Sequence, residues 1–177
     1  MHKRFIITGA PGTGKTTAIN TLRKSGYQCF EEISRKIISH QQENGGTKTP
    51  WGDLTGFTDM IYQQTIIELQ LTITKHTFVD RGLPDIIAYL QAGTHPIPEY
   101  LLDFPFKKFY NTTVFLMPLW EEIYSTDPQR PQSYEEAMLI HQHLIRVYKR
   151  LGFKVIVVPK TTVAQRVDFM QSIITTD

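Results

Sequence analysis

Gly9-Ala10-Pro11-Gly12-Thr13-Gly14-Lys15-Thr16 is the stretch of sequence that decides the fold. It matches the pattern G-x-x-x-x-G-K-S/T, in which glycines let backbone N–H groups turn inward around phosphate oxygens. The β-rich residues 4–8 before it predict a strand, and residues 16–25 after it predict a helix closed by Gly26. A strand, a loop and a helix in this order are the context that the pattern requires, so the sequence predicts nucleotide binding.

The residues of this loop are expected to bind ATP and its Mg²⁺ ion in different ways. Lys15 is predicted to face solvent and to place its positive charge against the outer phosphates, which also makes it a catalytic candidate. The hydroxyl of Thr16 is predicted to help hold the Mg²⁺ ion. The alternative is a glycine-rich turn that only joins a strand to a helix. The predicted nucleotide-binding residues are Gly9, Ala10, Pro11, Gly12, Thr13, Gly14, Lys15, Thr16 and Thr17.

Strands and helices alternate along the rest of the chain. Apolar patterning predicts strands at residues 27–30, 77–80, 113–117 and 153–158. It predicts helices at residues 32–42, about 57–71, 84–90, 98–103, 134–151 and 163–174, the fifth of them opened by a capping box at residues 133–136. This alternation favours an α/β fold in which helices cover both faces of a parallel sheet, and residues 1–177 are predicted to form one domain.

Composition excludes several other classes of protein. The 177 residues carry 19 Lys and Arg against 17 Asp and Glu, a net charge of +2 that is too small for a dedicated nucleic-acid binder. The single cysteine, Cys29, excludes an internal disulfide framework and a cysteine-rich metal site. The longest late aliphatic run, residues 155–158, is far too short to span a membrane. We therefore expect a cytoplasmic protein without a membrane span.

An acidic residue is expected where a strand beside the phosphate loop ends. Asp80 follows Phe78 and Val79 and is the predicted Mg²⁺ ligand, the alternative being a helix-capping aspartate. Arg81 comes next, where hydrolases with this loop often have a glutamate that polarises water. This difference disfavours a mechanical ATPase. The absence of an N/T-K-x-D pattern favours ATP over GTP.

Three further motifs accompany the loop, at residues 31–35 (Glu-Glu-Ile-Ser-Arg), 80–85 (Asp-Arg-Gly-Leu-Pro-Asp) and 126–130 (Thr-Asp-Pro-Gln-Arg). With these motifs the chain resembles the kinase-like P-loop NTPases. More closely, it resembles the AAA-domain family that groups the ribosylnicotinamide kinase domain of the bifunctional NAD-biosynthesis regulator with the nucleotide-binding domain of the TRPL translocation defect protein. The resemblance implies a three-layer α/β/α fold, a five-stranded parallel sheet in the order 2-3-1-4-5, and a small lid carrying Arg130.

Charged residues after the second and third strands are candidates for handling an acceptor. Glu32 is predicted to orient or deprotonate the acceptor hydroxyl, although an acidic first helical turn favoured by the helix dipole explains it equally well. Arg81 and Arg130 are predicted to stabilise charge on the transferred phosphoryl group. Residues 127–132 are expected to form the lid. The predicted substrate-binding residues are Glu31, Arg35, Gln63 and Asp85, with Glu68 on the same helix as Gln63.

These observations predict a Mg²⁺-dependent kinase that moves the γ-phosphoryl group of ATP to a hydroxyl of a small, nucleoside-like acceptor. The alternative is a regulatory ATP- or GTP-binding module, or a slow NTPase, that signals to a partner. The predicted partners are the nucleotide and a small-molecule acceptor, with no nucleic acid, and the protein is expected to be a monomer or homodimer.

Overall fold

The sheet at the centre of the molecule has five parallel strands. A computed structural model describes residues 3–124 and 132–174. The strands lie in the order β2-β3-β1-β4-β5, so the predicted topology is confirmed. Their bounds are Arg4–Thr8 for β1, Gln28–Phe30 for β2, Thr77–Asp80 for β3, Tyr110–Leu116 for β4 and Lys154–Val157 for β5.

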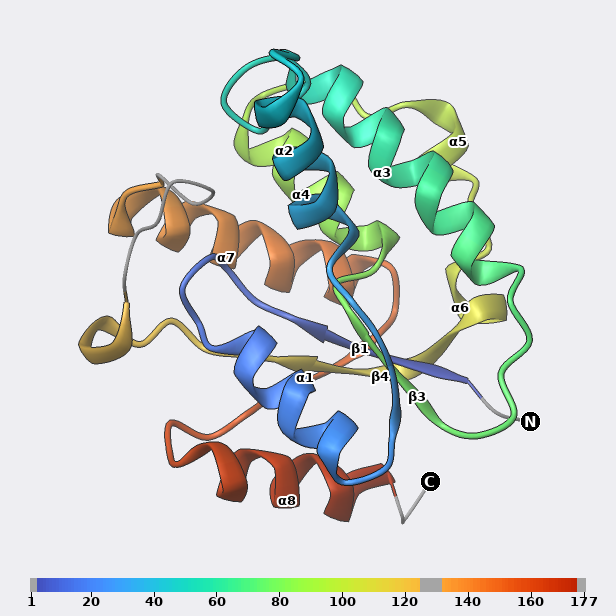
Figure 1. Ribbon diagram of the computed structural model, residues 1–177, viewed down its shortest axis with the longest axis vertical. Helices are drawn as coiled ribbons and strands as arrows, with labels where there is room; N and C mark the ends of the chain where they lie inside the picture. The colour runs from blue at the N-terminus through green and yellow to red at the C-terminus, as the bar shows by residue number, and fades with distance from the viewer. Residues whose placement is uncertain (1–2, 125–131, 175–177) are drawn as a thin grey trace.

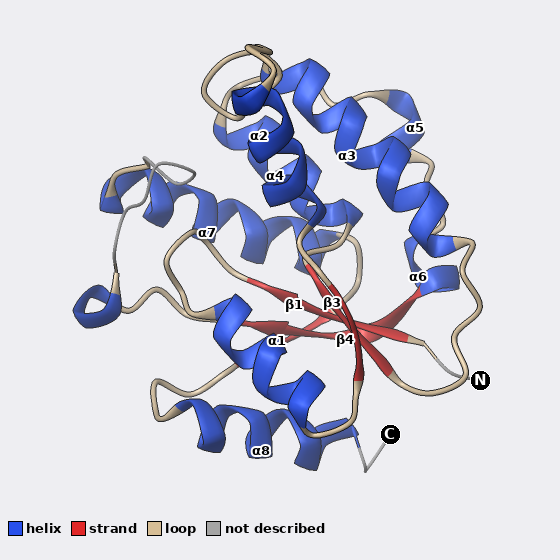
Figure 2. Cartoon of the chain, viewed as in Figure 1, coloured by secondary structure: helices blue, strands red, loops and turns tan. Residues whose placement is uncertain are grey.

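Helices cover both faces of this sheet and give the three layers seen in Figures 1 and 2. Two helices lie on one face, α1 (Lys15–Lys24) and α8 (Val163–Ile174). The opposite face carries the larger group, with α4 (Leu83–Ala92) and α7 (Tyr134–Arg150) near the sheet and α2 (Ile33–Glu43) and α3 (Leu54–Leu69) farther out. Short helices α5 (Glu99–Leu102) and α6 (Phe106–Phe109) and the 3₁₀ turn η1 (Glu121–Ile123) complete the described elements.

Alternating side chains along the strands build one hydrophobic core on each face. Phe5 and Ile7 of β1 pack with Phe78 and Phe115 against α1 and α8. Ile6, between them in sequence, belongs to the larger core beneath α4 and α7. Successive strand residues point to opposite faces, so an apolar run that is buried on both sides requires this arrangement.

The central strands place Asp80 and Arg81, two predicted site residues, beside the end of β1. Ile7 of β1 pairs in register with Asp80 of β3, and the backbone N–H of Arg81 donates to the Ile7 carbonyl. The phosphate loop follows β1 directly. The carboxyl ends of parallel strands meet at one edge, which is where ligands bind in open α/β sheets.

Most element boundaries lie close to their predicted positions. The capping box is confirmed, because Ser133 Oγ accepts from the Glu136 N–H at 3.2 Å and Glu136 Oε2 accepts from the Ser133 N–H at 2.7 Å. Strand β4 begins at Tyr110, three residues before its predicted start, directly after α6, a short helix that the sequence reading did not predict. Helix α3 ends at Leu69, so Leu71, predicted to be part of it, lies beyond its end with an exposed side chain.

None of the helices among the described residues is long and apolar enough to cross a membrane.

Candidate nucleotide and acceptor site

The phosphate loop turns sharply from β1 into α1, and two of its glycines are required by the backbone. A Cβ atom on Gly9 would lie 2.7 Å from the carbonyl oxygen of Met117, and Gly9 has a φ of +151°. Gly14 caps the N-terminus of α1 with a φ of +81°, in the left-handed region. Residues with side chains are strained in such conformations, so the glycines are needed to aim backbone N–H groups and the positive end of α1 at an anion.

Lys15 lies beneath the loop with only 2% of its surface exposed, so the expectation that it faces solvent is wrong. Its Nζ donates to the carbonyl oxygens of Gly9 and Ala10, both at 2.9 Å. A buried ammonium group needs such acceptors, and the inward-turned loop provides them. Thr16 and Thr17, in contrast, are exposed on the first turn of α1.

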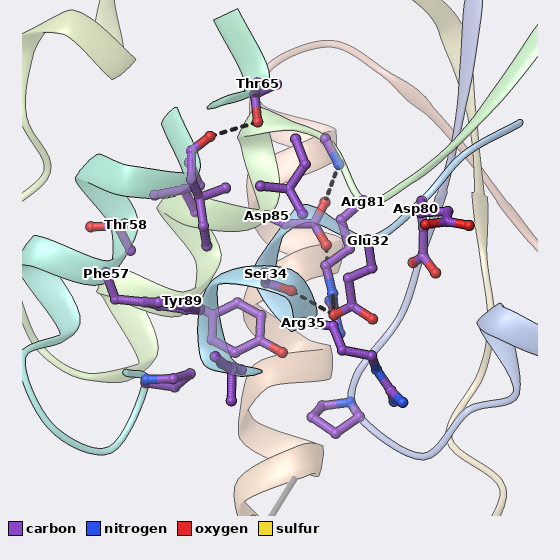
Figure 3. A pocket seen from close by; sticks show the side chains of 18 of the residues that line it. Glu32, Ser34, Arg35, Phe57, Thr58, Thr65, Asp80, Arg81, Asp85 and Tyr89 are labelled. Carbon is purple, nitrogen blue, oxygen red and sulfur yellow. Dashed lines mark hydrogen bonds and ion pairs between the residues drawn. The ribbon is translucent and has the colours of Figure 1, made fainter. Parts of the chain in front are cut away.

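A pocket opens beside this loop, with a volume of about 850 Å³ when its open mouth is included. Its walls come from Pro11 of the loop, the start of α2, one face of α3, the end of β3 and the start of α4 (Figure 3). Of the predicted catalytic and acceptor-side residues, Glu31, Glu32, Arg35, Asp80, Arg81 and Asp85 all line it.

Arg81 is the centre of the polar contacts in this pocket. Its Nε donates to Glu32 Oε1 at 2.9 Å, and its NH1 donates to the Gly9 carbonyl at 3.0 Å and to Asp85 Oδ1 at 3.2 Å. The guanidinium carbon lies 5.4 Å from the centre of the Tyr89 ring. Burial alone would lower the pKa of Arg81, but Tyr89 and the neighbouring carboxylates raise it well above its ordinary value. Arg81 therefore places a permanent positive charge between the loop and the pocket.

The backbone of Arg81 is itself unusual. Its φ of +70° lies in the left-handed region, although Arg81 is not a glycine. Backbone strain of this kind persists only where surrounding contacts hold it, and it is frequent at functional sites. The three hydrogen bonds of the guanidinium hold the residue in this conformation.

Glu32 forms the other half of the central ion pair. It precedes α2 as its N-cap residue, and its side chain is about one-tenth exposed. Oε1 accepts from Ser34 Oγ at 2.7 Å as well as from Arg81. Figure 3 shows the Glu32 and Arg81 side chains pointing toward each other. Two residues that the sequence suggested for separate roles are thus parts of one contact.

Asp85 is surrounded by donors from its own chain. Its carboxylate accepts hydrogen bonds from Thr8 Oγ1 at 2.7 Å, from the Gly82 N–H at 3.1 Å, from Arg81 and from the hydroxyl of Tyr148. The side chain is buried, and its bond from the Gly82 N–H caps the N-terminus of α4. These donors show that Asp85 positions its neighbours, while a direct contact with substrate stays a prediction.

Oxygen donors suited to magnesium stand beside the loop. Asp80 ends β3 with 6% of its surface exposed, and Thr16 follows Lys15 on α1. Among the described residues no group of three His, Cys, Asp or Glu side chains could hold a metal ion. Mg²⁺ usually takes one or two carboxylates together with phosphate oxygens and water. The donors present therefore fit an ion that arrives with a nucleotide.

Glu31 lies at the mouth of the pocket. Its side chain is more than half exposed and pairs with Lys36 at 3.0 Å and with Arg23 at 3.5 Å. The hydrogen bond and charge of Lys36 lower the pKa of Glu31. This carboxylate therefore stays ionised at the rim, where Lys36 and Arg23 balance its charge.

Gln63 is exposed and does not line the pocket, so the structure contradicts its predicted place there. The face of α3 that lines the pocket carries Thr58, Ile61, Thr65 and Glu68, at helical spacings of three and four residues. Gln63 lies about 200° around the helix from Ile61, because each residue turns the helix by about 100°. Helical periodicity counted from Ile61 would have selected Thr65 and Glu68.

Arg166 holds the phosphate loop from the opposite side, a role that sequence reasoning missed. Its Nε donates to the Thr161 carbonyl at 2.9 Å, and its NH1 donates to the Thr13 carbonyl at 3.5 Å. The guanidinium carbon lies 4.7 Å from the centre of the Trp120 ring. The contact joins residues 153 positions apart, so no local pattern in the sequence signals it.

Arg130 and most of the predicted lid at residues 127–132 lie outside the described residues. The exception is Gln132, which lines the pocket and whose carbonyl oxygen accepts from the hydroxyl of Tyr124 at 2.6 Å.

Solved structures with the same fold include deoxyadenosine and thymidylate kinases. A deoxyadenosine kinase from M. mycoides with bound dCTP is 15% identical, with a TM-score of 0.67 over 98% of this chain and 100% of that one. The thymidylate kinase of Candida albicans is 16% identical, with a TM-score of 0.67 over 99% and 92%. That of Ehrlichia chaffeensis is 15% identical, with a TM-score of 0.63 over 98% of each chain. At these identities the comparison establishes the fold alone.

At the level of sequence, no curated protein matches the chain. The family model described as an AAA domain matches residues 4–166, from the first residue of β1 to the arginine that holds the phosphate loop. The match spans the phosphate loop, both charged motifs that line the pocket and all five strands, and the chain therefore belongs to this AAA-domain family of P-loop proteins.

Proposed function

We propose that the protein is a Mg²⁺-dependent kinase that transfers the γ-phosphoryl group of ATP to a hydroxyl of a nucleoside-like acceptor. The observation that carries this proposal is the ion pair of Glu32 and Arg81, set in the wall of a pocket that opens beside the phosphate loop. A carboxylate and an arginine in this position provide one group for the attacking hydroxyl and one for the transferred phosphoryl.

The phosphate end of the site supplies positive charge and fixed donors. Backbone N–H groups of the loop bind the phosphates, helped by the positive end of α1. Lys15 moves its ammonium group from the loop carbonyls toward the outer phosphates when they bind. Thr16 and Asp80 would hold Mg²⁺, which supplies charge neutralisation across the phosphate oxygens.

The acceptor end supplies the proton acceptor. The acceptor hydroxyl donates a hydrogen bond to the Glu32 carboxylate, and its proton passes to Glu32 as its oxygen attacks the γ-phosphorus. The bond between the γ-phosphorus and the bridging oxygen breaks, and ADP leaves. Arg81 neutralises charge on the moving phosphoryl group, and Asp85 holds Arg81 in place through the bond at 3.2 Å. Arg35, also in the wall, binds the acceptor beside Glu32.

The lining of the pocket favours transfer to an organic acceptor over transfer to water. Phe57, Ile61 and Ile86 give apolar walls, and such walls contribute nothing to positioning a water molecule. Aromatic and apolar walls with a few placed polar groups are typical of sites that bind planar ligands. Solved structures with this fold include a deoxyadenosine kinase and a thymidylate kinase, which supports a nucleoside-like acceptor.

A binding screen tests this proposal. Nucleosides are added to the protein with Mg²⁺ and a non-hydrolysable ATP analogue, and thermal stability is measured with each ligand alone and with both. We expect a nucleoside that raises the melting temperature more in the presence of the analogue, since the two ligands share the wall at Arg81. The same nucleoside should gain a phosphate from ATP. Slow ATP hydrolysis with no nucleoside bound or phosphorylated would favour the regulatory alternative.

A further inference from the structure

The α3 wall of the pocket has a polarity of its own. Besides Phe57, it carries Thr58, Ile61, Thr65 and Glu68, which share one face of the helix. From Thr58 to Glu68 this face extends for about 15 Å along the helix axis, at 1.5 Å per residue. That length is sufficient for a nucleoside to lie in the pocket with its sugar toward Glu32 and its base along the helix.

The two threonine hydroxyls of this wall have already used their hydrogens. Thr58 Oγ1 donates to the Thr55 carbonyl at 2.8 Å, and Thr65 Oγ1 donates to the Ile61 carbonyl at 2.8 Å. A hydroxyl has one hydrogen to donate and two lone pairs. Each threonine therefore offers a ligand only a hydrogen-bond acceptor.

Glu68 adds a carboxylate to the same wall. Within residues 3–124 and 132–174, no side chain or backbone group forms a hydrogen bond or ion pair with this carboxylate. Arg4, which lies nearby, donates instead to the backbone carbonyls of Glu68 and Leu71, at 3.1 and 2.8 Å. A half-buried carboxylate that lines a pocket without such a partner is suited to a donor on the ligand.

The cations that line the pocket lie elsewhere, although the charges of Arg4 and Lys36 also act on Glu68. Arg35 belongs to α2 and Arg81 follows β3, so the donors are on the side of the phosphate loop. Phe57 and Tyr89 contribute aromatic rings to the pocket walls. The pocket thus presents donors where phosphate is expected, rings for a planar group, and acceptors along α3.

We propose that the α3 wall recognises the base of the acceptor by accepting hydrogen bonds from donor groups on the base. The acceptor is therefore a nucleoside whose base carries an exocyclic amine. This inference rests on the proposed function and adds the substrate class to it. A keto group in place of the amine would set an oxygen against the Glu68 carboxylate and the Thr65 hydroxyl, acceptor against acceptor. Sites whose polar groups are left unpaired reject such analogues strongly.

Matched nucleoside pairs test the proposal: cytidine with uridine, and adenosine with inosine, in ribose and 2′-deoxyribose forms. Binding is measured by calorimetry at pH 8, with Mg²⁺ and the ATP analogue present, and phosphorylation is measured with ATP. We expect the amino member of the preferred pair to bind at least about tenfold more tightly. Glu68→Gln should reduce this preference to less than about threefold, because an amide can turn its N–H group toward a keto oxygen.

Two further variants keep the result interpretable. Thr65→Val removes one acceptor with little change of shape, and should reduce the preference even if Glu68→Gln folds poorly. Glu43→Gln makes the same charge change on an exposed residue outside the pocket, and should leave the preference unchanged.

The outcomes separate this inference from the kinase assignment. Tighter binding of the keto member, or a preference unchanged in both Glu68→Gln and Thr65→Val, overturns the reading of the base while phosphorylation still supports a kinase. If no nucleoside of either kind binds or gains phosphate, the proposed function fails and the inference fails with it.

Discussion

Thr8 and Asp85 are joined by a buried hydrogen bond of 2.7 Å that ties the last residue of β1 to the first turn of α4. Arg81 completes the link, because its NH1 donates both to Asp85 and to the carbonyl of Gly9, the first residue of the phosphate loop. The phosphate loop and the pocket beside it therefore share one buried polar cluster. A change in that cluster is expected to affect both sites together.

Asp85→Asn should destabilise the protein by about 3 kcal/mol and weaken binding of both ligands. The carboxylate accepts from four donors, and an amide would turn an N–H group toward some of them and leave Arg81 with one carboxylate fewer. Urea unfolding measures the stability. Tyr148→Phe removes a single donor to Asp85 and should cost about 1 kcal/mol. Equal costs for the two variants would contradict the central role of Asp85.

Lys15→Ala should abolish most Mg-nucleotide affinity while the protein remains folded. The carbonyls that Lys15 contacts keep other donors, since Thr13 Oγ1 donates to Ala10 and Arg81 donates to Gly9. Removing the buried ammonium therefore leaves no orphaned carbonyl, and we expect a change in stability of about 1 kcal/mol or less. Calorimetry measures ATP affinity, with Lys24→Ala at the exposed end of α1 as the control. A folded variant with unchanged ATP affinity would refute the assignment of Lys15 to the phosphate-binding site.

Glu32→Gln and Asp80→Asn should have different effects. An amide at position 32 still offers an oxygen to Arg81 and Ser34 but takes up no proton, so Mg-ATP should bind normally while transfer falls by about 10² to 10⁴. Asp80→Asn should remove the Mg²⁺ dependence of nucleotide affinity. The readouts are ATP affinity with and without Mg²⁺ and the single-turnover transfer rate. If no acceptor gains phosphate and Glu32→Gln leaves slow hydrolysis unchanged, the regulatory alternative replaces the kinase.

The fold was predictable because its signals are local. The phosphate loop, the apolar strands and the capping box at Ser133 each follow from a few neighbouring residues, and the family resemblance supplied the strand order.

The site was only partly predictable. Its charged residues were found from motifs, but their pairing was not, because Tyr148 and Asp85 lie 63 residues apart and Glu32 and Arg81 lie 49 apart. The orientation of α3 also required packing against α2 and α4, which decides that Glu68 rather than Gln63 faces the pocket.

The last prediction concerns the pH dependence of stability. Burial raises the pKa of Glu68 to about 7, against the opposing charges of Arg4 and Lys36. A carboxyl group with a raised pKa holds its proton in the folded state at pH values where the unfolded chain has released it. Its contribution to stability is therefore largest at low pH and is lost as the pH rises from about 4.5 to about 7.

Glu68→Gln should remove this dependence, since glutamine carries no charge to desolvate. Relative to the native protein, the variant should gain roughly 2 to 3 kcal/mol of unfolding free energy between pH 4 and pH 8, a value reduced for partial contact with solvent. Urea unfolding of both proteins across this range gives the difference directly, and Glu43→Gln controls for the loss of a surface charge. A difference that stays constant with pH would show that Glu68 titrates as an ordinary surface carboxylate.

An acceptor that donates to the ionised carboxylate should lower the pKa of Glu68. A saturating amino-bearing nucleoside is therefore expected to flatten the same pH profile in the native protein and to leave that of Glu68→Gln unchanged.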